Sequence, residues 1–278
     1  MLLCGLIGAG IQGSRAPALH EAEAAAQGLQ LRYRLIDLER LGAGVEALPG
    51  LLRDAVREGL RGLNITYPCK QAVMPLLDAL SEEARAIGAV NTVVIANGRL
   101  TGHNTDGPGW GWGFRRALPD ADLSRVALLG AGGAGSACAD AVLRLGARAL
   151  AIVDREPRHS AELAARMNAI HGPRCVAAAD IAQALAGASG LIHATPTGMA
   201  KMPGSPLADS LLHAGLWVSD IVYVPLDTAL LQGARRAGCR VMDGGHMNVG
   251  QALGAFRLFT GRDADAARMD AQFRGFYA

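Results

Sequence analysis

The sequence has few aromatic residues, little net charge and no long apolar run, and each shortage excludes a class of protein. Aromatic residues make up 4% of the 278 residues while 50% are hydrophobic, so Ala, Leu, Val and Ile must build the core. The formal charge of +2 comes from 27 basic and 25 acidic residues without a long block of one sign, which leaves no electrostatic footprint for nucleic acid. No apolar run approaches the roughly 20 residues that span a bilayer. We therefore expect a small-molecule partner, with no nucleic acid and no membrane.

Disulfide and metal frameworks are also missing from the sequence. The cysteines are odd in number, widely spaced and without a CxxC pair, which is typical of thiols in a reducing cytoplasm: Cys4, Cys69, Cys138, Cys175 and Cys239. The N-terminus lacks a basic segment and its apolar run breaks at Gly8, too early for a signal peptide. The histidines show no HxH or HExxH spacing, so no metal site is predicted. These features predict a cytoplasmic location.

Short apolar strands alternate with Ala/Leu/Arg-rich amphipathic stretches along the whole chain, a pattern typical of parallel sheets covered by helices. A chain of this length favours two compact lobes. The sequence therefore predicts an α/β protein with two α/β lobes. We expect strands near Leu2–Gly8, Leu31–Asp37, Gly62–Ile65, Val93–Ala96, Val126–Gly130, Ala149–Asp154, Gly190–Ala194, Leu216–Asp220 and Arg240–Met242.

The glycine-rich stretch Thr101–Gly113 is the sharpest interruption of this pattern, and we place the first domain boundary there. A new strand follows it and opens a fresh series of strands and helices. The last stretch, Met247–Phe273, is predicted to be helical. The pair Trp110 and Trp112 is interpreted as packing at the junction rather than as a stacking platform.

The pattern GxGxxG occurs twice, at Gly8–Gly13 and at Gly130–Gly135, each time after an apolar run. The second copy leads into a helix of small residues, and the next strand ends at Asp154. A carboxylate there can accept hydrogen bonds from both ribose hydroxyls and repels a 2′-phosphate, so NAD is favoured over NADP. Arg155 and Arg158 keep NADP as the alternative. For the first copy we favour a tight strand-to-helix turn without a ligand.

Polar residues that suit alcohol oxidation follow the third predicted strand and its neighbours. Asn64, Thr66 and Lys70 cluster after one strand, and Asn91 and Asp106 lie on later loops. Oxidation of an alcohol needs a base for the hydroxyl proton, a carboxylate to orient that base and amides to hold neighbouring hydroxyls. A lysine can serve as the base when desolvation lowers its pKa. Taken singly, Lys70 is more often a solvated charge at a helix start, Asn91 a turn former and Asp106 a helix cap.

The motifs together resemble the shikimate dehydrogenase superfamily over essentially the whole chain, and most closely its NAD-using quinate/shikimate dehydrogenase branch. The matching segments are Ser14–His20, Asn64–Lys70, Ala89–Thr92, Asn104–Gly107, Gly130–Gly135, Ala194–Met199, Asp220–Tyr223 and Gly244–Ala252. The resemblance implies a substrate-binding catalytic domain of residues 1–105, completed by 245–278, and an NAD-binding Rossmann domain of residues 106–244. It also implies a role in aromatic amino acid biosynthesis or quinate catabolism, in a monomer or homodimer.

Roles for individual residues follow from the same resemblance. Lys70 would be the general base and Asp106 its partner at the reacting hydroxyl. The substrate, a cyclic hydroxy acid of the quinate/shikimate type, would contact Ser14, Thr66, Asn91, Tyr223 and Gln251. The dinucleotide NAD would contact Gly130, Ala131, Gly132, Gly133, Ala134, Asp154, Arg155, Thr195 and Gly244.

Two departures from the family pattern leave the substrate open. Ala16 replaces the second hydroxyl residue expected beside the substrate carboxylate, and Arg15 is a candidate to replace its contact. His193 replaces the usual asparagine before Ala194. The alternatives are an amino- or otherwise modified shikimate-like substrate, a nucleotide-binding sensor without turnover, and a folate-type dehydrogenase, which would not explain Asn64 and Asp106.

Overall fold

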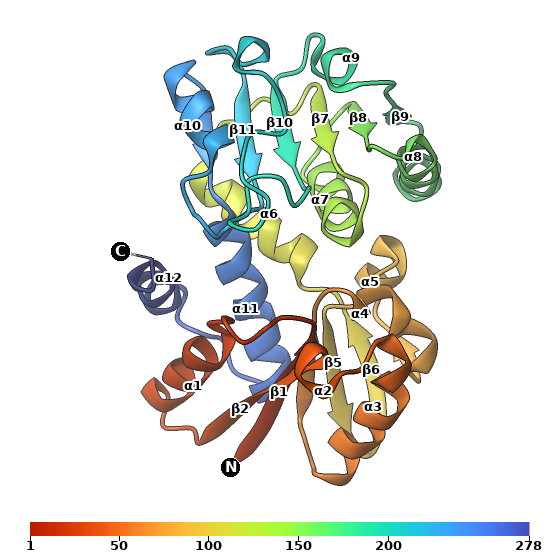
Figure 1. The fold of residues 1–278 in the computed structure, drawn as a ribbon, viewed down its shortest axis with the longest axis vertical. Coiled ribbons are helices and arrows are strands. Elements are labelled where there is room, and N and C mark those ends of the chain that lie inside the picture. The colour runs from red at the N-terminus through yellow and green to blue at the C-terminus, as the bar shows by residue number, and fades with distance from the viewer. Residues whose placement is uncertain (278) are drawn as a thin grey trace. The chain divides into compact units, whose positions relative to one another are not determined.

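The computed structural model describes residues 1–277 and divides the chain into two compact α/β units, each built on its own sheet (Figure 1). The first unit consists of Met1–Thr105 and Gln251–Phe276, and the second of Asp106–Gly250. Within residues 1–277, none of the helices combines the length and the apolar character needed to cross a bilayer. The predicted α/β class with two lobes is confirmed.

The first unit contains a six-stranded mixed sheet in the order β2-β1-β3-β5-β6-β4. Only β5 runs against its neighbours, because a turn through Asn97 and Gly98, both with positive φ, leads β5 back into β6. The expectation of purely parallel sheets is therefore wrong for this unit. The strands are β1 (Leu2–Gly8), β2 (Leu31–Asp37), β3 (Gly62–Ile65), β4 (Ala79–Leu80), β5 (Thr92–Ala96) and β6 (Arg99–His103).

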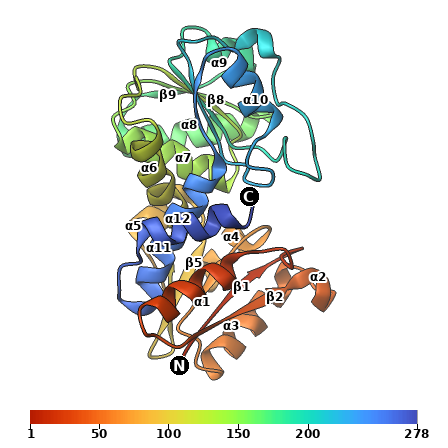
Figure 2. The same ribbon diagram turned by 90° about the vertical axis from the view of Figure 1, so that its left-hand side faces the viewer.

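Helices cover both faces of this first sheet. One face packs against the short helices η1 (Val45–Ala47) and η2 (Met74–Leu76) and against α2 (Leu38–Leu41), α3 (Leu48–Arg57), α4 (Cys69–Ala72) and α5 (Glu82–Ile87). On the other, α1 (Ala16–Ala26) lies beside α12 (Ala266–Gly275), as Figure 2 shows. The buried Glu23 carboxylate accepts hydrogen bonds from Arg268 Nε at 2.6 Å and from its terminal nitrogen at 2.9 Å, which ties α12 to α1.

The C-terminal stretch forms two helices instead of the single helix predicted over Met247–Phe273. They are α11 (Gly244–Thr260) and α12, and Gly261 adopts a positive φ of 73° between them. Asp265 then starts the second helix, because its side chain accepts a hydrogen bond from the Arg268 backbone N–H.

The second unit has a fully parallel sheet in the order β9-β8-β7-β10-β11-β12. Numbered along the chain, this is the 3-2-1-4-5-6 order of dinucleotide-binding sheets, with the order reversing between β7 and β10. The strands are β7 (Val126–Leu129), β8 (Leu150–Val153), β9 (Cys175–Ala177), β10 (Gly190–His193), β11 (Trp217–Asp220) and β12 (Arg240–Met242). Helices α6 (Asp106–Ala117), α7 (Gly133–Arg144) and α8 (Pro157–His171) pack on one face, and η3 (Asp209–Leu211), α9 (Ile181–Leu185) and α10 (Ala229–Arg236) on the other.

The glycine-rich stretch Thr101–Gly113 is the end of β6 and most of α6 rather than an interruption between elements. Glycines on both helices let α6 approach the second-unit part of α11, because a Cβ on Gly250 would lie 2.3 Å from the Gly109 carbonyl oxygen and one on Gly113 would lie 2.7 Å from His246 Cβ. Trp110 is fully buried in the core of this unit and donates its indole N–H to Ser219 Oγ at 3.0 Å. The interpretation of Trp110 as a packing residue fits this position.

Candidate functional site

Polar side chains of the first unit gather at one edge of its sheet. The strands β1, β3 and β6 end at this edge, and the antiparallel β5 begins there, so residues that flank these ends become neighbours. Asn91 and Thr105 are buried and joined twice: Thr105 N donates to Asn91 Oδ1 at 2.8 Å, and Asn91 Nδ2 donates to Thr105 Oγ1 at 2.9 Å. The backbone of Lys70 belongs to the same region, since its carbonyl accepts a hydrogen bond from Val90 N at 2.9 Å.

Asn64, which the sequence grouped with the chemical residues, supports this edge instead. Its Nδ2 donates to Thr92 Oγ1 at 3.0 Å, and its Oδ1 accepts from the buried Tyr33 hydroxyl at 2.7 Å. An amide with both ends engaged and 7% exposure fixes the strand register rather than binding a ligand.

The first glycine motif, Gly8–Gly13, positions Thr66, and its backbone N–H groups form hydrogen bonds within the protein. A Cβ on Gly8 would lie 2.2 Å from Thr66 Cγ2, so only glycine lets this side chain approach the end of β1. Beyond it, the Asp37 carboxylate accepts hydrogen bonds from Gly10 N at 2.9 Å and from Ile11 N at 3.2 Å. The backbone N–H groups that could have bound a pyrophosphate are therefore bonded to Asp37. This arrangement fits the interpretation of the first glycine motif as a tight turn without a ligand.

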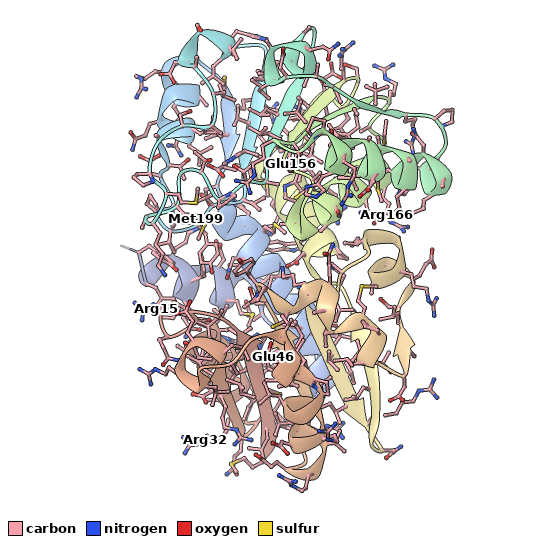
Figure 3. The ribbon with its side chains drawn as sticks, turned by 45° about the vertical axis from the view of Figure 1, so that its right-hand side comes forward. Arg15, Arg32, Glu46, Glu156, Arg166 and Met199 are labelled. Carbon is pink, nitrogen blue, oxygen red and sulfur yellow. The ribbon has the colours of Figure 1, made fainter. Side chains whose placement is uncertain are left out.

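Ser14 and Arg15 lie at the start of α1. Ser14 is half-buried, and its Oγ accepts a hydrogen bond from Ala16 N at 3.3 Å, which leaves its hydroxyl proton available to a ligand. The Arg15 guanidinium lies over the Phe276 ring, 5.4 Å from its centre, and Arg15 is labelled in Figure 3. Arg15 is exposed, and its replacement of the missing hydroxyl at Ala16 stays a prediction. Gln251 begins the first-unit part of α11, one turn before Gly254, at which a Cβ would lie 3.1 Å from Thr105 Cγ2.

The second glycine motif forms an open turn at the point where the strand order reverses. Gly130 has a φ of 105°, and a Cβ there would lie 2.6 Å from the Ala194 carbonyl oxygen of the adjacent strand end. Gly132, by contrast, faces open space and precedes α7 without a side-chain cap. The first backbone N–H groups of a helix have no partner within the helix and favour an anion. The residues of this turn therefore fit the pyrophosphate of a dinucleotide.

Asp154 lies beside this turn as the sequence predicted. Its Oδ2 accepts a hydrogen bond from Ala131 N at 2.8 Å and its Oδ1 one from Glu156 N at 3.0 Å; Glu156 is labelled in Figure 3. Burial alone would raise the pKa of Asp154, but these two donors and the neighbouring His159 lower it, so the carboxylate stays charged. Arg155 is exposed, and Arg158 forms an exposed ion pair with Glu162 at 3.2 Å.

His193, for which the sequence offered no role, forms a buried hydrogen-bonded chain with three other side chains. Its Nδ1 lies 2.9 Å from Asp220 Oδ1, and its Nε2 lies 2.5 Å from Thr195 Oγ1. Thr228 Oγ1 completes the chain by donating to Asp220 Oδ2 at 2.7 Å. Asp220 and Thr228 lie 27 and 35 residues after His193, so the sequence shows no spacing that could have revealed the cluster.

The remaining candidates of the second unit lie at the starts of helices and in the loop after β11. Asp106 is 5% exposed and begins α6. Burial and the negative charge of Asp106 both raise the pKa of the Tyr223 hydroxyl. Gly244 begins α11, where a Cβ would lie 2.4 Å from the carbonyl oxygens of Ile221 and Val222. Lys70 belongs to the first unit, whereas Asp106 and Tyr223 belong to the second.

Similarity to known proteins decides the family. Residues 6–93 match the family model for the shikimate dehydrogenase substrate binding domain. A shikimate dehydrogenase (NADP(+)) of Streptomyces avermitilis is 55% identical, over 96% of this chain and 93% of that protein. The chain belongs to the shikimate dehydrogenase family. A second relative in this family, a quinate/shikimate dehydrogenase (NAD(+)) of Corynebacterium efficiens, is 46% identical over 98% of this chain and 97% of that protein.

A solved structure extends the similarity to the fold. The quinate dehydrogenase of Corynebacterium glutamicum in complex with NAD superposes with a TM-score of 0.93, at 44% identity, over 99% of both chains. The relatives therefore carry both cofactor names, NADP(+) and NAD(+), and overall identity does not choose between the two.

Proposed function

We propose that the chain is a dehydrogenase that transfers a hydride between NAD and a ring hydroxyl of a cyclic polyhydroxy acid of the quinate/shikimate type. The observation that carries this proposal is the open glycine turn at the strand-order reversal of the second sheet, in a chain that matches shikimate dehydrogenases over nearly its full length. NAD, when bound, supplies the hydride acceptor. The residues proposed to hold it are Gly130 to Ala134, Asp154, Arg155, Thr195 and Gly244.

The choice of NAD over NADP rests on Asp154. Its carboxylate is charged and already oriented by Ala131 N and Glu156 N beside the turn. A 2′-phosphate placed there would meet this negative charge, whereas a ribose hydroxyl can donate to it.

For the chemical step we propose Lys70 as the general base, with Asp106 as its partner at the reacting hydroxyl. Lys70 is half-buried at the carboxyl edge of the first sheet, and Thr66 and Asn91 occupy the same edge. These two residues, with Ser14, Tyr223 and Gln251, would bind the other oxygen atoms of the substrate. A lysine base has to be neutral when it accepts the proton, and partial desolvation by bound substrate and cofactor favours that form.

The experiment measures NADH formation with quinate, shikimate and amino-substituted analogues, for the wild type, Lys70→Ala and Lys70→Arg. Loss of a general base costs about 10²- to 10⁴-fold in kcat. Arginine keeps the positive charge but cannot deprotonate, so both variants should lose activity equally while they bind NAD normally in calorimetry. Turnover by either variant within tenfold of the wild type would refute Lys70 as the base. NAD binding without turnover on any ring acid would favour the sensor.

Cofactor choice is tested separately with Asp154→Asn, which removes the charge and retains an acceptor for Ala131 N. We expect the ratio of kcat/KM for NAD to that for NADP to fall by at least tenfold, about 1.4 kcal/mol. Asp180→Asn is the matched control, because Asp180 is an exposed carboxylate of the same unit that caps α9. An unchanged ratio in Asp154→Asn would show that the ribose is read by other residues.

A further inference from the structure

The buried chain formed by Thr228, Asp220, His193 and Thr195 reaches from the core of the second unit to the end of β10. The side chains of His193 and Asp220 have no exposed surface, whereas Thr195, the last member, is half-buried. A Cβ on Gly130 would lie 3.0 Å from Thr195 Cγ2, so Thr195 lies directly against the glycine turn. The chain therefore connects a fixed interior carboxylate to a hydroxyl at the proposed dinucleotide site.

The donors around Asp220 fix the direction of the hydrogen bonds that its carboxylate accepts. Thr228 Oγ1 accepts from Leu231 N at 3.3 Å and so gives its proton to Asp220, while Val222 N donates to Asp220 Oδ1 at 3.0 Å. A carboxylate surrounded by such donors accepts from His193 as well, which places the imidazole proton on Nδ1. In a neutral imidazole, Nε2 is then an acceptor, and the Thr195 hydroxyl donates its proton to it.

The direction of the hydrogen bond from Thr195 to His193 determines whether Thr195 can donate to a ligand or accept from it. Its proton is directed to His193, and one lone pair of its oxygen receives the Thr197 N–H at 3.3 Å. The second lone pair is the remaining hydrogen-bonding position, so Thr195 can act toward a ligand only as an acceptor. In a dinucleotide-binding sheet of this order, the two nucleotide halves lie on either side of the strand-order reversal, and Asp154 is on the adenosine side. The end of β10 lies on the other side, where the nicotinamide half belongs.

We propose that His193, held by Asp220, is a positioning residue that fixes the Thr195 hydroxyl as an acceptor for the carboxamide N–H of nicotinamide. The proposal rests on the proposed function, because it assumes that a nicotinamide dinucleotide binds at this turn. The carboxamide substituent carries the N–H donors of the nicotinamide group. An acceptor held in a fixed position, such as the Thr195 hydroxyl, therefore binds the amide nitrogen and orients the ring. His193 acts through Thr195 and does not itself touch the cofactor.

The same unit contains a second histidine–aspartate pair, His171 and Asp140, whose contacts have a purely structural role. His171 Nε2 lies 2.8 Å from Asp140 Oδ1, and Arg144 binds the other carboxylate oxygen at 2.8 Å, so the contacts join α7 and α8. His193 differs because its second ring nitrogen continues to a partly exposed hydroxyl. His171→Asn is therefore the matched control for His193→Asn.

The test measures calorimetric dissociation constants for NAD and for 3-acetylpyridine adenine dinucleotide, in which a methyl group replaces the amide nitrogen. The wild type should bind NAD about tenfold more tightly than the analogue, the usual size of one hydrogen bond. In His193→Asn, which can still bond Asp220, and in Thr195→Val, the two ligands should bind within about twofold of each other. His171→Asn should lose thermal stability and keep the tenfold preference.

A second measurement examines the proton positions without any ligand. Nitrogen-15 NMR of the imidazoles, assigned with His193→Asn, should show His193 protonated at Nδ1 and unprotonated at Nε2. A protonated Nε2 overturns the proposal, and so does an unchanged preference for NAD in His193→Asn. If the wild type binds neither dinucleotide while NMR shows the expected tautomer, the proposed function and the carboxamide contact fail but the hydrogen-bond direction stands.

Discussion

At the scale of single residues, Ala16 is the substitution with the clearest consequence for substrate binding. By its resemblance to shikimate dehydrogenases the chain should carry a second hydroxyl residue at this position, and the neighbouring Arg15 guanidinium lies over Phe276. We expect Ala16→Ser to lower KM for quinate or shikimate by about tenfold, since a hydrogen bond to a charged group contributes about 1.5 kcal/mol. Steady-state kinetics checks this, with Ala18→Ser on the exposed side of α1 as control. An unchanged KM would indicate that the carboxylate is bound elsewhere.

His20 gives the first unit a dependence of stability on pH. It is 1% exposed, its Nδ1 has no hydrogen-bond partner among the described residues, and burial lowers its pKa from 6.5 to about 4. Between these two values the unfolded chain binds a proton that the folded chain does not. The free energy of unfolding therefore falls as the pH falls from 6.5 to 4, by about 3 kcal/mol at most.

Urea unfolding at pH 7 and pH 4.5 measures this effect. Carboxylates such as Glu23 also lose stabilisation in acid, so the informative quantity is the difference between the wild type and His20→Phe. Phenylalanine keeps a flat ring against Tyr33, whose ring centre lies 5.1 Å away, and cannot be protonated. We expect a smaller loss of stability in the variant, and equal losses would exclude His20 as the cause.

At the scale of elements, glycines determine how closely α6 and the second-unit part of α11 pack. A Cβ on Gly250 would lie 2.3 Å from the Gly109 carbonyl oxygen, which is backbone and cannot move aside. Gly250→Ala should therefore destabilise the protein by about 1 to 3 kcal/mol, the range of overpacked core sites. Gly111 lies in α6, like Gly109, but a Cβ on Gly111 would meet nothing closer than 3.8 Å. Gly111→Ala should stabilise α6 by roughly 0.5 to 1 kcal/mol. Thermal unfolding that ranks the two variants in the opposite order would contradict this packing.

The elements also show what the sequence could and could not predict. The long apolar strands were found almost to the residue, because continuous burial gives a strong pattern. The edge strands β4 and β9, of two and three residues, are absent from the prediction, although the equally short edge strand β12 is present in it. The strand β6 is also absent from the prediction, although Asn97–Gly98 is a sequence signal for the hairpin that joins it to β5. The glycines of α6 suggest an interruption in the sequence, because the contact of Gly113 with His246 joins residues that are far apart in the chain.

The candidate site also has parts that the sequence predicts and parts that it does not. The glycine turn and Asp154 were predicted because they follow strands in sequence and act through the backbone beside them. The buried chain of His193 could not be predicted, because its partner Asp220 comes from another strand and only the parallel pairing of β10 with β11 places the two opposite each other. Contacts between residues that are close in the sequence can be predicted from it. A contact between two strands can be predicted only when the register of their pairing is known.

At the scale of the whole molecule, the two units give different kinds of support to the proposed reaction. The first contributes polar groups fixed by hydrogen bonds between strand ends, as with Asn91 and Thr105. The second contributes a glycine turn that leads into α7 without a side-chain cap, beside a charged carboxylate. The proposed dinucleotide site therefore lies within the second unit, and binding to it can be measured without a substrate.

NAD should raise the melting temperature through binding to the folded second unit alone. At a concentration one hundred times its dissociation constant, a ligand adds about 2.7 kcal/mol of stability. For a chain of this length each kcal/mol raises Tm by about 2 to 4 °C, so scanning calorimetry should show a shift of roughly 5 to 10 °C. NADP at equal concentration should give a smaller shift, because Asp154 opposes its 2′-phosphate.

Gly132→Ala is the decisive variant for this measurement. A Cβ there meets no atom within 4 Å, so the variant should fold with an unchanged Tm in the absence of ligand. The same methyl group occupies the open space of the turn that the pyrophosphate needs, and the shift caused by NAD should disappear. Gly111→Ala, remote from the turn on α6, should keep the full shift. A normal NAD shift in Gly132→Ala would place the dinucleotide elsewhere and remove the structural basis for both the proposed reaction and the role of Thr195.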